Sequence, residues 1–324
     1  MELLLLLALA IAGIVILIVV LFSVALCLGI VIGLWLYGPY YYDKSENNGW
    51  RASNWLRTHQ FWNRLKRFYK HRIVQVGEPS EASQGALYAC HPHGICALSV
   101  GLTFACSNPD YIPQKRVHIG VLSIIFKIPI LRDVYLGLGC IHVDWKTMQS
   151  HIELGHATVL IPGGVNEMGR PIYDNRDERF LDRAFACQTQ PSVSITTKIM
   201  KEWSTPVSTK GKKPKSYLKS FAVVTKVHKD PISFDIIPVY CHNEDDIYII
   251  WQNEWRWVTW IRRKMAKYTG YPFPTGFIGP WPWKPLTTYI GPPHRLLPGD
   301  TLKSYKSRYW EALEALKLEA IKEH

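Results

Sequence analysis

The sequence predicts an α/β fold in which a mostly parallel sheet, flanked by helices, follows an N-terminal membrane segment. Three observations support this prediction. Short apolar runs of strand length alternate with stretches of helical periodicity, as in a parallel sheet with crossover helices. Two of these runs end in glycine-containing turns that carry histidine or glutamate. A long uncharged apolar stretch runs from Leu3 to Leu36.

Composition narrows the classes of function. With 48% hydrophobic residues, 13 Trp and 17 Tyr, the 324-residue chain has the composition of a folded protein of one large or two ordinary domains. Its net charge of +12 suits anionic lipid headgroups or a phosphate-bearing substrate, and the membrane segment argues against nucleic acid as a partner. The seven cysteines are an odd number without framework spacing, which indicates reduced thiols.

Residues 1–43 are predicted to form the membrane segment. No charge occurs between Leu3 and Leu36, a run longer than the ~20 residues that cross a hydrocarbon core. The surplus length allows a single tilted span or a tight membrane hairpin, and the lack of a polar turn favours the single span. An aromatic belt ends at Tyr42, and the cations beyond it place the rest of the chain in the cytosol.

Residues 44–80 are predicted to form a basic amphipathic interfacial segment. Between Trp50 and Ile73, large apolar side chains are interleaved with arginine and lysine. This composition is typical of a helix that lies among lipid headgroups, and an ordinary amphipathic surface helix is the alternative.

Residues 81–324 are predicted to form the α/β domain. Strands are expected near Leu87 and at Val117–Ile125, Gly139–Val143, Thr158–Ile161, Ile232–Tyr240 and Asp245–Trp251. Pro238 predicts a sheet edge or a strand end for the run Ile232–Tyr240, because proline has no N–H to donate to the hydrogen-bond ladder of a sheet. Helices are expected at Thr147–His156 and from about Asp300, the latter covering the sheet. The basic stretch 188–231 predicts a surface insertion, and the Pro- and Trp-rich stretch 273–293 predicts a loop, either packed or dipping into lipid.

The most informative turn is His91-Pro92-His93-Gly94, which follows an apolar run and precedes a stretch of helical spacing. Pro92 restricts both its own backbone and that of His91, so the two imidazoles are held in a defined relation. Imidazole titrates near neutral pH and suits proton transfer. Gly94 leaves room for a ligand to approach the backbone. The alternative is an ordinary polar turn.

A second turn, Pro162-Gly163-Gly164-Val165-Asn166-Glu167, follows another strand run. Its glycines allow backbone amides to face a ligand, and the Glu167 carboxylate can orient an imidazole. By itself this pattern is typical of an ordinary turn. The charged stretch 170–183 contains Arg176 and Arg179, whose guanidinium groups suit phosphate binding. A stretch with this density of charge more often forms a solvent-exposed surface.

Together these features resemble the diacylglycerol acyltransferase 2 family, which includes monoacylglycerol and wax-alcohol acyltransferases. The resemblance rests on His91-Pro92-His93-Gly94. It continues in order through Ile128–Asp133, Gly137–Gly139, Pro162–Glu167, Ile237–Tyr240, Thr288–Pro293 and Tyr309–Leu316. Three features depart from the family: the insertion at 188–231, Arg176–Phe180 without its glycine, and Cys241–Glu244 in place of Phe-Gly-Glu.

The resemblance implies a glycerolipid acyltransferase-like fold and transfer of a fatty acyl group from acyl-CoA to diacylglycerol, which makes triacylglycerol. It implies that His93 is the general base, with His91 as the second candidate. It also implies that the Glu167 carboxylate orients the base. The substrate site would contain Gly94, Gly163, Gly164 and Asn166, with glycine amides receiving the oxyanion, and Arg132, Arg176 and Arg179 would hold the CoA phosphates. Acyl-CoA is a co-substrate, and neither a bound cofactor nor a metal is expected.

Two alternatives to this function remain open. One is acylation of monoacylglycerol or a long-chain alcohol, and the other is a lipid-binding membrane tether without catalysis. The expected location is the endoplasmic reticulum membrane with the α/β domain in the cytosol, with lipid droplets as a second location. Membrane lipids are expected partners, nucleic acid is not, and the sequence leaves open whether the chain forms a homo-oligomer.

Overall fold

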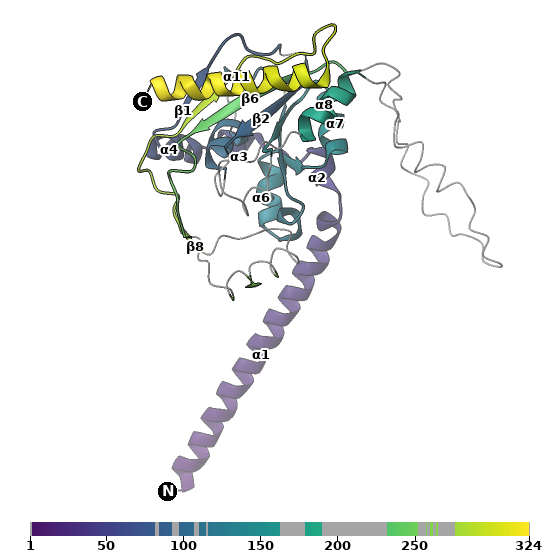
Figure 1. The fold of residues 1–324 in the computed structure, drawn as a ribbon. Coiled ribbons are helices and arrows are strands. Elements are labelled where there is room, and N and C mark those ends of the chain that lie inside the picture. The colour runs from purple at the N-terminus through teal and green to yellow at the C-terminus, as the bar shows by residue number, and fades with distance from the viewer. Residues whose placement is uncertain are drawn as a thin grey trace, which may run out of the picture. The chain divides into compact units, whose positions relative to one another are not determined.

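The computed structural model describes residues 2–81, 84–92, 97–106, 110–114, 116–162, 179–189, 232–251, 257, 260–261, 264 and 276–323. They belong to two units of the chain, residues 1–48 and residues 49–324. Figure 1 shows the elements of both units.

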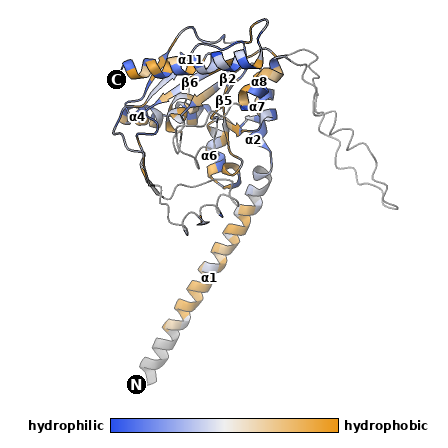
Figure 2. Ribbon diagram, in the orientation of Figure 1, coloured by the Kyte–Doolittle hydropathy of each residue, from blue (hydrophilic) through white to orange (hydrophobic). Residues whose placement is uncertain are grey.

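The first unit consists of α1 (Glu2–Tyr41) and the short α2 (Ser45–Asn48). Within the part of the chain that the structure describes, Ile11–Trp35 of α1 is the stretch long and apolar enough to cross a membrane. Figure 2 shows the hydrophobic colouring of this stretch. The helix runs without a break through Gly13, Gly29 and Gly33, because nothing polar in the sequence ends it. The structure therefore has a single apolar helix here in place of a hairpin.

The second unit is built on a sheet of seven strands among the described residues, in the order β1-β9-β6-β2-β5-β3-β4. In chain order these strands are β1 (Arg72–Gln75), β2 (Ala86–His91), β3 (Val117–Val121), β4 (Cys140–His142), β5 (Ala157–Leu160), β6 (Asp235–His242) and β9 (Thr287–Ile290). A separate antiparallel pair joins β7 (Ile249–Trp251) to β8 (Gly276–Ile278). All neighbours in the large sheet are parallel except β6 and β9, which confirms the mostly parallel α/β prediction.

The prediction for Pro238 was wrong, because β6 lies inside the sheet between β9 and β2. Pro238 pairs with Ala89 of β2, and its carbonyl accepts a hydrogen bond from the Gly291 N–H at 2.9 Å. The carbonyl and nitrogen of a strand residue point to the same side, so the missing N–H faces β9. The β6–β9 register begins at the next residue, Val239, so the missing N–H falls at the end of that ladder.

Side chains alternate between two cores, one on each face of the sheet. Along β2, Ala86, Tyr88 and Cys90 belong to one hydrophobic cluster, and Leu87 and Ala89 belong to the other. This period of two is the ordinary consequence of the strand pleat, and it makes β2 apolar on both sides as in other covered parallel sheets. His91, the next residue after Cys90, therefore falls on the Leu87 face.

Helices cover both faces. The Leu87 face is covered by α7 (Trp145–Glu153), α8 (Arg179–Thr189) and α11 (Leu302–Lys322), with Met148, Leu181 and Tyr309 in the shared core. Figure 1 shows α11 lying along the sheet across β6, and its buried Tyr305, Tyr309, Leu313 and Leu316 confirm the predicted covering helix. The Tyr88 face is covered by α5 (Leu98–Val100), the π-helical η1 (Gly101–Ala105), the 3₁₀ turn η2 (Ile125–Lys127) and α6 (Leu131–Gly137).

The stretch predicted as an interfacial segment contributes to this unit. It contains α3 (Asn54–Thr58), α4 (Gln60–Phe68) and the edge strand β1. Trp62 and Leu65 of α4 pack against the core, whereas Phe61 and Phe68 are more than half exposed. The helix is thus amphipathic as expected. Of the predicted insertion, Gln188 and Thr189 end α8, and residues 190–231 lie outside the described residues.

Candidate functional site

His91 ends β2 at the carboxyl edge of the parallel strands, beside Tyr240 of β6. Its Nε2 lies 3.1 Å from the hydroxyl of Tyr309 on α11, and its ring packs near Phe180 and Trp310. Burial raises the pKa of Tyr309 well above its usual value, so the phenol keeps its proton and can donate to the imidazole. The closing helix therefore fixes the orientation of the first histidine of the turn.

The other residues of the two turns lie outside the described residues: His93, Gly94, Gly163, Gly164, Asn166 and Glu167. The strands that lead into them are nevertheless neighbours. Parallel β2 and β5 pair from Ala86 with Ala157 to Ala89 with Leu160. The chain therefore leaves both strands at the same edge of the sheet, where α/β proteins place their ligands.

Glu244 is a candidate site residue that the sequence analysis did not identify. It follows β6 at this same edge and is 1% exposed. Its two carboxylate oxygens accept hydrogen bonds from the backbone N–H groups of Leu98, at 2.6 Å, and Ser99, at 2.8 Å. These N–H groups begin the helical stretch that follows the histidine turn, so Glu244 anchors the chain just beyond His93 and Gly94.

Two further observations concern the backbone strain beside this anchor and the ionisation of its carboxyl group. Ala97, immediately before the helical stretch, has a left-handed φ of 46°, which costs a non-glycine residue ~1–2 kcal/mol. Burial raises the pKa of Glu244 to about 7, although the bonds to Ser99 and Leu98 act to lower it. A carboxyl with a raised pKa and an adjacent strained residue are typical of functional sites. The position of a lone glutamate within Cys241–Glu244 is the sequence signal that indicates it.

The three predicted phosphate-binding arginines fall in different settings. Arg132, on α6, is 1% exposed, and Arg179, the first residue of α8, is exposed. Arg176 lies outside the described residues. Because an exposed guanidinium is accessible to a phosphate from solvent, Arg179 suits the predicted role better than Arg132 does.

A second polar pair ends β4, which the sequence analysis also did not identify. The His142 Nδ1 lies 2.9 Å from an Asp144 carboxylate oxygen, and the other oxygen accepts the Thr147 N–H at the start of α7. Although partial burial opposes it, hydrogen bonds from Thr147 and His142 lower the pKa of Asp144. Strands β5 and β3 separate β4 from β2, so this pair acts as a helix cap away from His91.

Comparison with known proteins agrees with the family resemblance. Residues 18–178 match the model of the family described as diacylglycerol acyltransferase. A 2-acylglycerol O-acyltransferase 3 of Homo sapiens is 27% identical over 140 residues, covering 41% of this chain and 40% of the relative. A diacylglycerol O-acyltransferase 2 of Dictyostelium discoideum is 27% identical over 139 residues, covering 41% and 42%.

An acyl-CoA wax alcohol acyltransferase 1 of Mus musculus is 27% identical over 129 residues, covering 38% of this chain and 39% of the relative. The chain thus spans about two fifths of the length of these curated relatives. No solved structure matches it. The matched residues include both the His91 turn and the Gly163 turn, together with β2 and β5 that lead into them. Residues 18–178 therefore belong to the diacylglycerol acyltransferase family.

Proposed function

We propose that this protein transfers a fatty acyl group from acyl-CoA to the hydroxyl of a glycerolipid, with diacylglycerol as the acceptor and triacylglycerol as the product. One observation carries the proposal: the family match includes the two turns that follow neighbouring parallel strands of the sheet. A glycerolipid acyltransferase-like fold is part of the proposal, and the mostly parallel α/β sheet supports it.

The proposed chemistry begins with activation of the acceptor hydroxyl, which is a poor nucleophile until a base takes its proton. His93 is the proposed base, and Glu167 would hold its tautomer and stabilise the imidazolium. The alkoxide attacks the thioester carbonyl of acyl-CoA, and amides near Gly94 and Gly163–Gly164 would stabilise the resulting oxyanion. Collapse of this intermediate forms the ester and releases the CoA thiolate, which takes the proton from His93.

The two substrates require different surroundings. CoA carries phosphates, which the exposed Arg179 at the start of α8 suits. Diacylglycerol is insoluble, so the site must open toward lipid. The apolar stretch Ile11–Trp35 and the exposed aromatic residues Phe61 and Phe68 support attachment to a membrane. We propose the endoplasmic reticulum membrane as that location, with lipid droplets as a second one.

An acceptor panel tests the proposal. Microsomes containing the chain are expected to incorporate labelled acyl-CoA into triacylglycerol faster with diacylglycerol than with monoacylglycerol or a long-chain alcohol. The names of the human and mouse relatives make these two acceptors the alternatives. The label is followed by separation of the lipid products. Equal labelling in microsomes that lack the chain would assign the product to the host membrane.

Glu167→Gln is expected to reduce acyl transfer by about tenfold or more, since a neutral amide neither stabilises an imidazolium nor fixes its tautomer as a carboxylate does. The measurement is the acyl-transfer rate at saturating acyl-CoA and diacylglycerol across pH. Glu153→Gln, at an exposed position at the end of α7, is the matched control. An unchanged rate in Glu167→Gln would remove this carboxylate from the proposed pair.

A further inference from the structure

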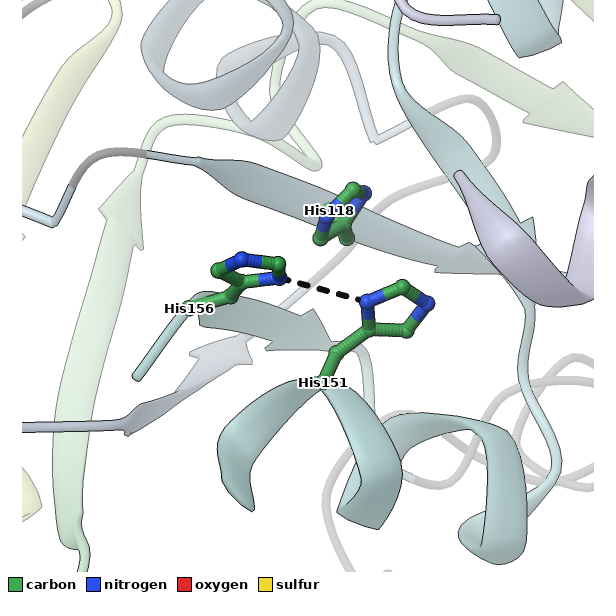
Figure 3. A group of neighbouring side chains, drawn as sticks. All are labelled: His118, His151 and His156. Atoms are coloured by element: carbon green, nitrogen blue, oxygen red, sulfur yellow. Dashed lines mark hydrogen bonds between the residues drawn. The ribbon is translucent and has the colours of Figure 1, made fainter. Parts of the chain in front are cut away.

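Three histidines meet in the second unit, away from the His91 turn. His118 lies on β3, His151 in the last turn of α7, and His156 in the turn between α7 and β5. One ring nitrogen of each lies within 4.8 Å of those of the other two. Figure 3 shows the three rings facing one another. Gly155, with a φ of 75°, forms the tight turn that brings His156 back beside His151.

The spacing of the rings agrees with metal coordination. The Nδ1 atoms of His151 and His156 are 3.3 Å apart. Two imidazole nitrogens bound to one tetrahedral Zn²⁺ at the usual Zn–N distance lie about 3.3–3.4 Å apart. The rings of His118 and His151 have centroids 4.2 Å apart, so the third ring is in direct contact with the pair.

His118 has the environment of a metal ligand. Its Nδ1 lies 3.2 Å from the Gly139 carbonyl, and because a carbonyl only accepts, Nδ1 carries the proton. The lone pair of the neutral ring is then on Nε2. This atom is buried in a side chain that is 1% exposed, and it has no hydrogen-bond partner among the described residues. An imidazole whose other nitrogen donates to a carbonyl is the usual outer-shell arrangement of a histidine ligand.

The backbone around His118 holds the ring in place. A Cβ at Gly49 would come within 2.4 Å of the ring carbon Cε1 and 2.6 Å of Nδ1, so only glycine fits there. Burial lowers the pKa of His118 to about 3 and that of His156 to about 4. Both rings are therefore neutral at pH 7, the form in which imidazole binds metal ions.

We propose that His118, His151 and His156 form a binding site for a divalent transition-metal ion, with Zn²⁺ as the ion that suits three imidazoles best. Without metal, the Nδ1 of one of the rings of His151 and His156 donates its proton to the Nδ1 of the other. When both Nδ1 atoms bind the metal, this hydrogen bond is lost and the proton moves to Nε2 of the ring that carried it. His156 is only partly buried, so a water molecule can reach the fourth position. The positive charge of Arg57 lowers the pKa of His118, and that of Arg116 lowers the pKa of His156. Both charges also repel a bound cation, so the bonds from the three nitrogens to the metal must outweigh this repulsion.

The position of the cluster assigns the metal a structural role. His118 pairs with Thr158 near the start of β5, and His156 immediately precedes that strand. The cluster is therefore near the amino edge of the parallel strands, whereas His91 is at the carboxyl edge of β2. A metal there would tie β3 to the α7–β5 turn. Its loss is expected to affect stability before chemistry, so the site can fail without affecting the proposed function.

Metal content and thermal unfolding of the full chain in detergent, purified with a tag that lacks histidine, test the proposal. We expect about one Zn²⁺ per wild-type chain, a rise in Tm on adding Zn²⁺ to the chelator-treated protein, and d–d absorption of a tetrahedral site with Co²⁺. His156→Ala is the main variant because this ring is the most accessible. It is expected to weaken Zn²⁺ binding at least about tenfold. His142→Ala, a partly exposed histidine outside the cluster, is the matched control and should bind as wild type does.

Several results would overturn the proposal. The first is a wild-type chain that takes up no Zn²⁺ and gives the same Tm with and without it, which would leave three neutral histidines packed together. Equal loss of binding in His142→Ala and His156→Ala would indicate adventitious surface binding. If His156→Ala does not fold, His151→Gln takes its place, and the wild-type Co²⁺ spectrum alone still decides whether a nitrogen-ligated tetrahedral site exists.

Discussion

His93→Ala is expected to reduce acyl transfer by about 10²–10⁴-fold, the usual contribution of a general base, while leaving expression and membrane insertion unchanged. Alanine removes the group that takes the hydroxyl proton but keeps the backbone of the turn. The measurement is the initial rate of triacylglycerol formation from labelled acyl-CoA at equal amounts of membrane protein. His142→Ala controls for loss of a partly exposed histidine at the end of another strand.

Comparison with His91→Ala separates the two histidines. His91 is held by the Tyr309 hydroxyl at 3.1 Å and packs against Phe180 and Trp310, so its removal is expected to lower Tm as well as activity. His93→Ala should lower activity alone. Wild-type turnover in His93→Ala together with an inactive but folded His91→Ala would transfer the role of base to His91.

Glu244→Ala is expected to destabilise the protein by about 2 kcal/mol or more and to reduce acyl transfer strongly. The variant leaves the N–H of Ser99, which is buried, and that of Leu98 without their acceptor, and an unsatisfied buried N–H costs ~1–3 kcal/mol. The same change releases the strained Ala97 and the chain that follows the histidine turn. Thermal unfolding of the full chain in detergent measures the first effect, and the labelled-acyl assay measures the second.

Glu244→Gln tests the ionisation of this carboxyl. Burial raises the pKa of Glu244 from 4.5 to about 7, so the folded state binds a proton more tightly than the unfolded state does. The stability that comes from this difference is fully present below about pH 4.5 and is lost as the pH rises to about 7. The Tm of the wild type minus that of Glu244→Gln should therefore decrease as the pH is raised from the lower to the higher of these two values. Parallel Tm curves for the two proteins would contradict the role of this carboxyl.

Much of the fold follows from local patterns. The apolar runs around Leu87, Val117, Gly139 and Thr158 predicted four strands that the structure contains, because short runs apolar on both faces are needed in a covered parallel sheet. The closing helix followed from the spacing of six residues: Leu302, Tyr305, Tyr309, Leu313, Leu316 and Ile321. The middle four are buried, whereas Leu302 and Ile321, near the two ends of the helix, are exposed. The sequence around Pro238 does not show which side of the strand the proline nitrogen faces. The prediction therefore placed this residue at a sheet edge or strand end.

The sequence alone determined the α/β class, the long apolar helix and the two turns that carry the proposed chemistry, since each depends on residues close together in the chain. Only the tertiary structure showed that Tyr309 holds His91, that Glu244 holds the helix start, and that His118 meets His151 and His156. The first two contacts are hydrogen bonds between residues 218 and 146 positions apart. In the third, the ring of His118 contacts that of His151, which comes 33 positions later in the chain. Sheet order and side-chain direction decide such contacts, and both arise from packing the whole chain rather than from any one segment.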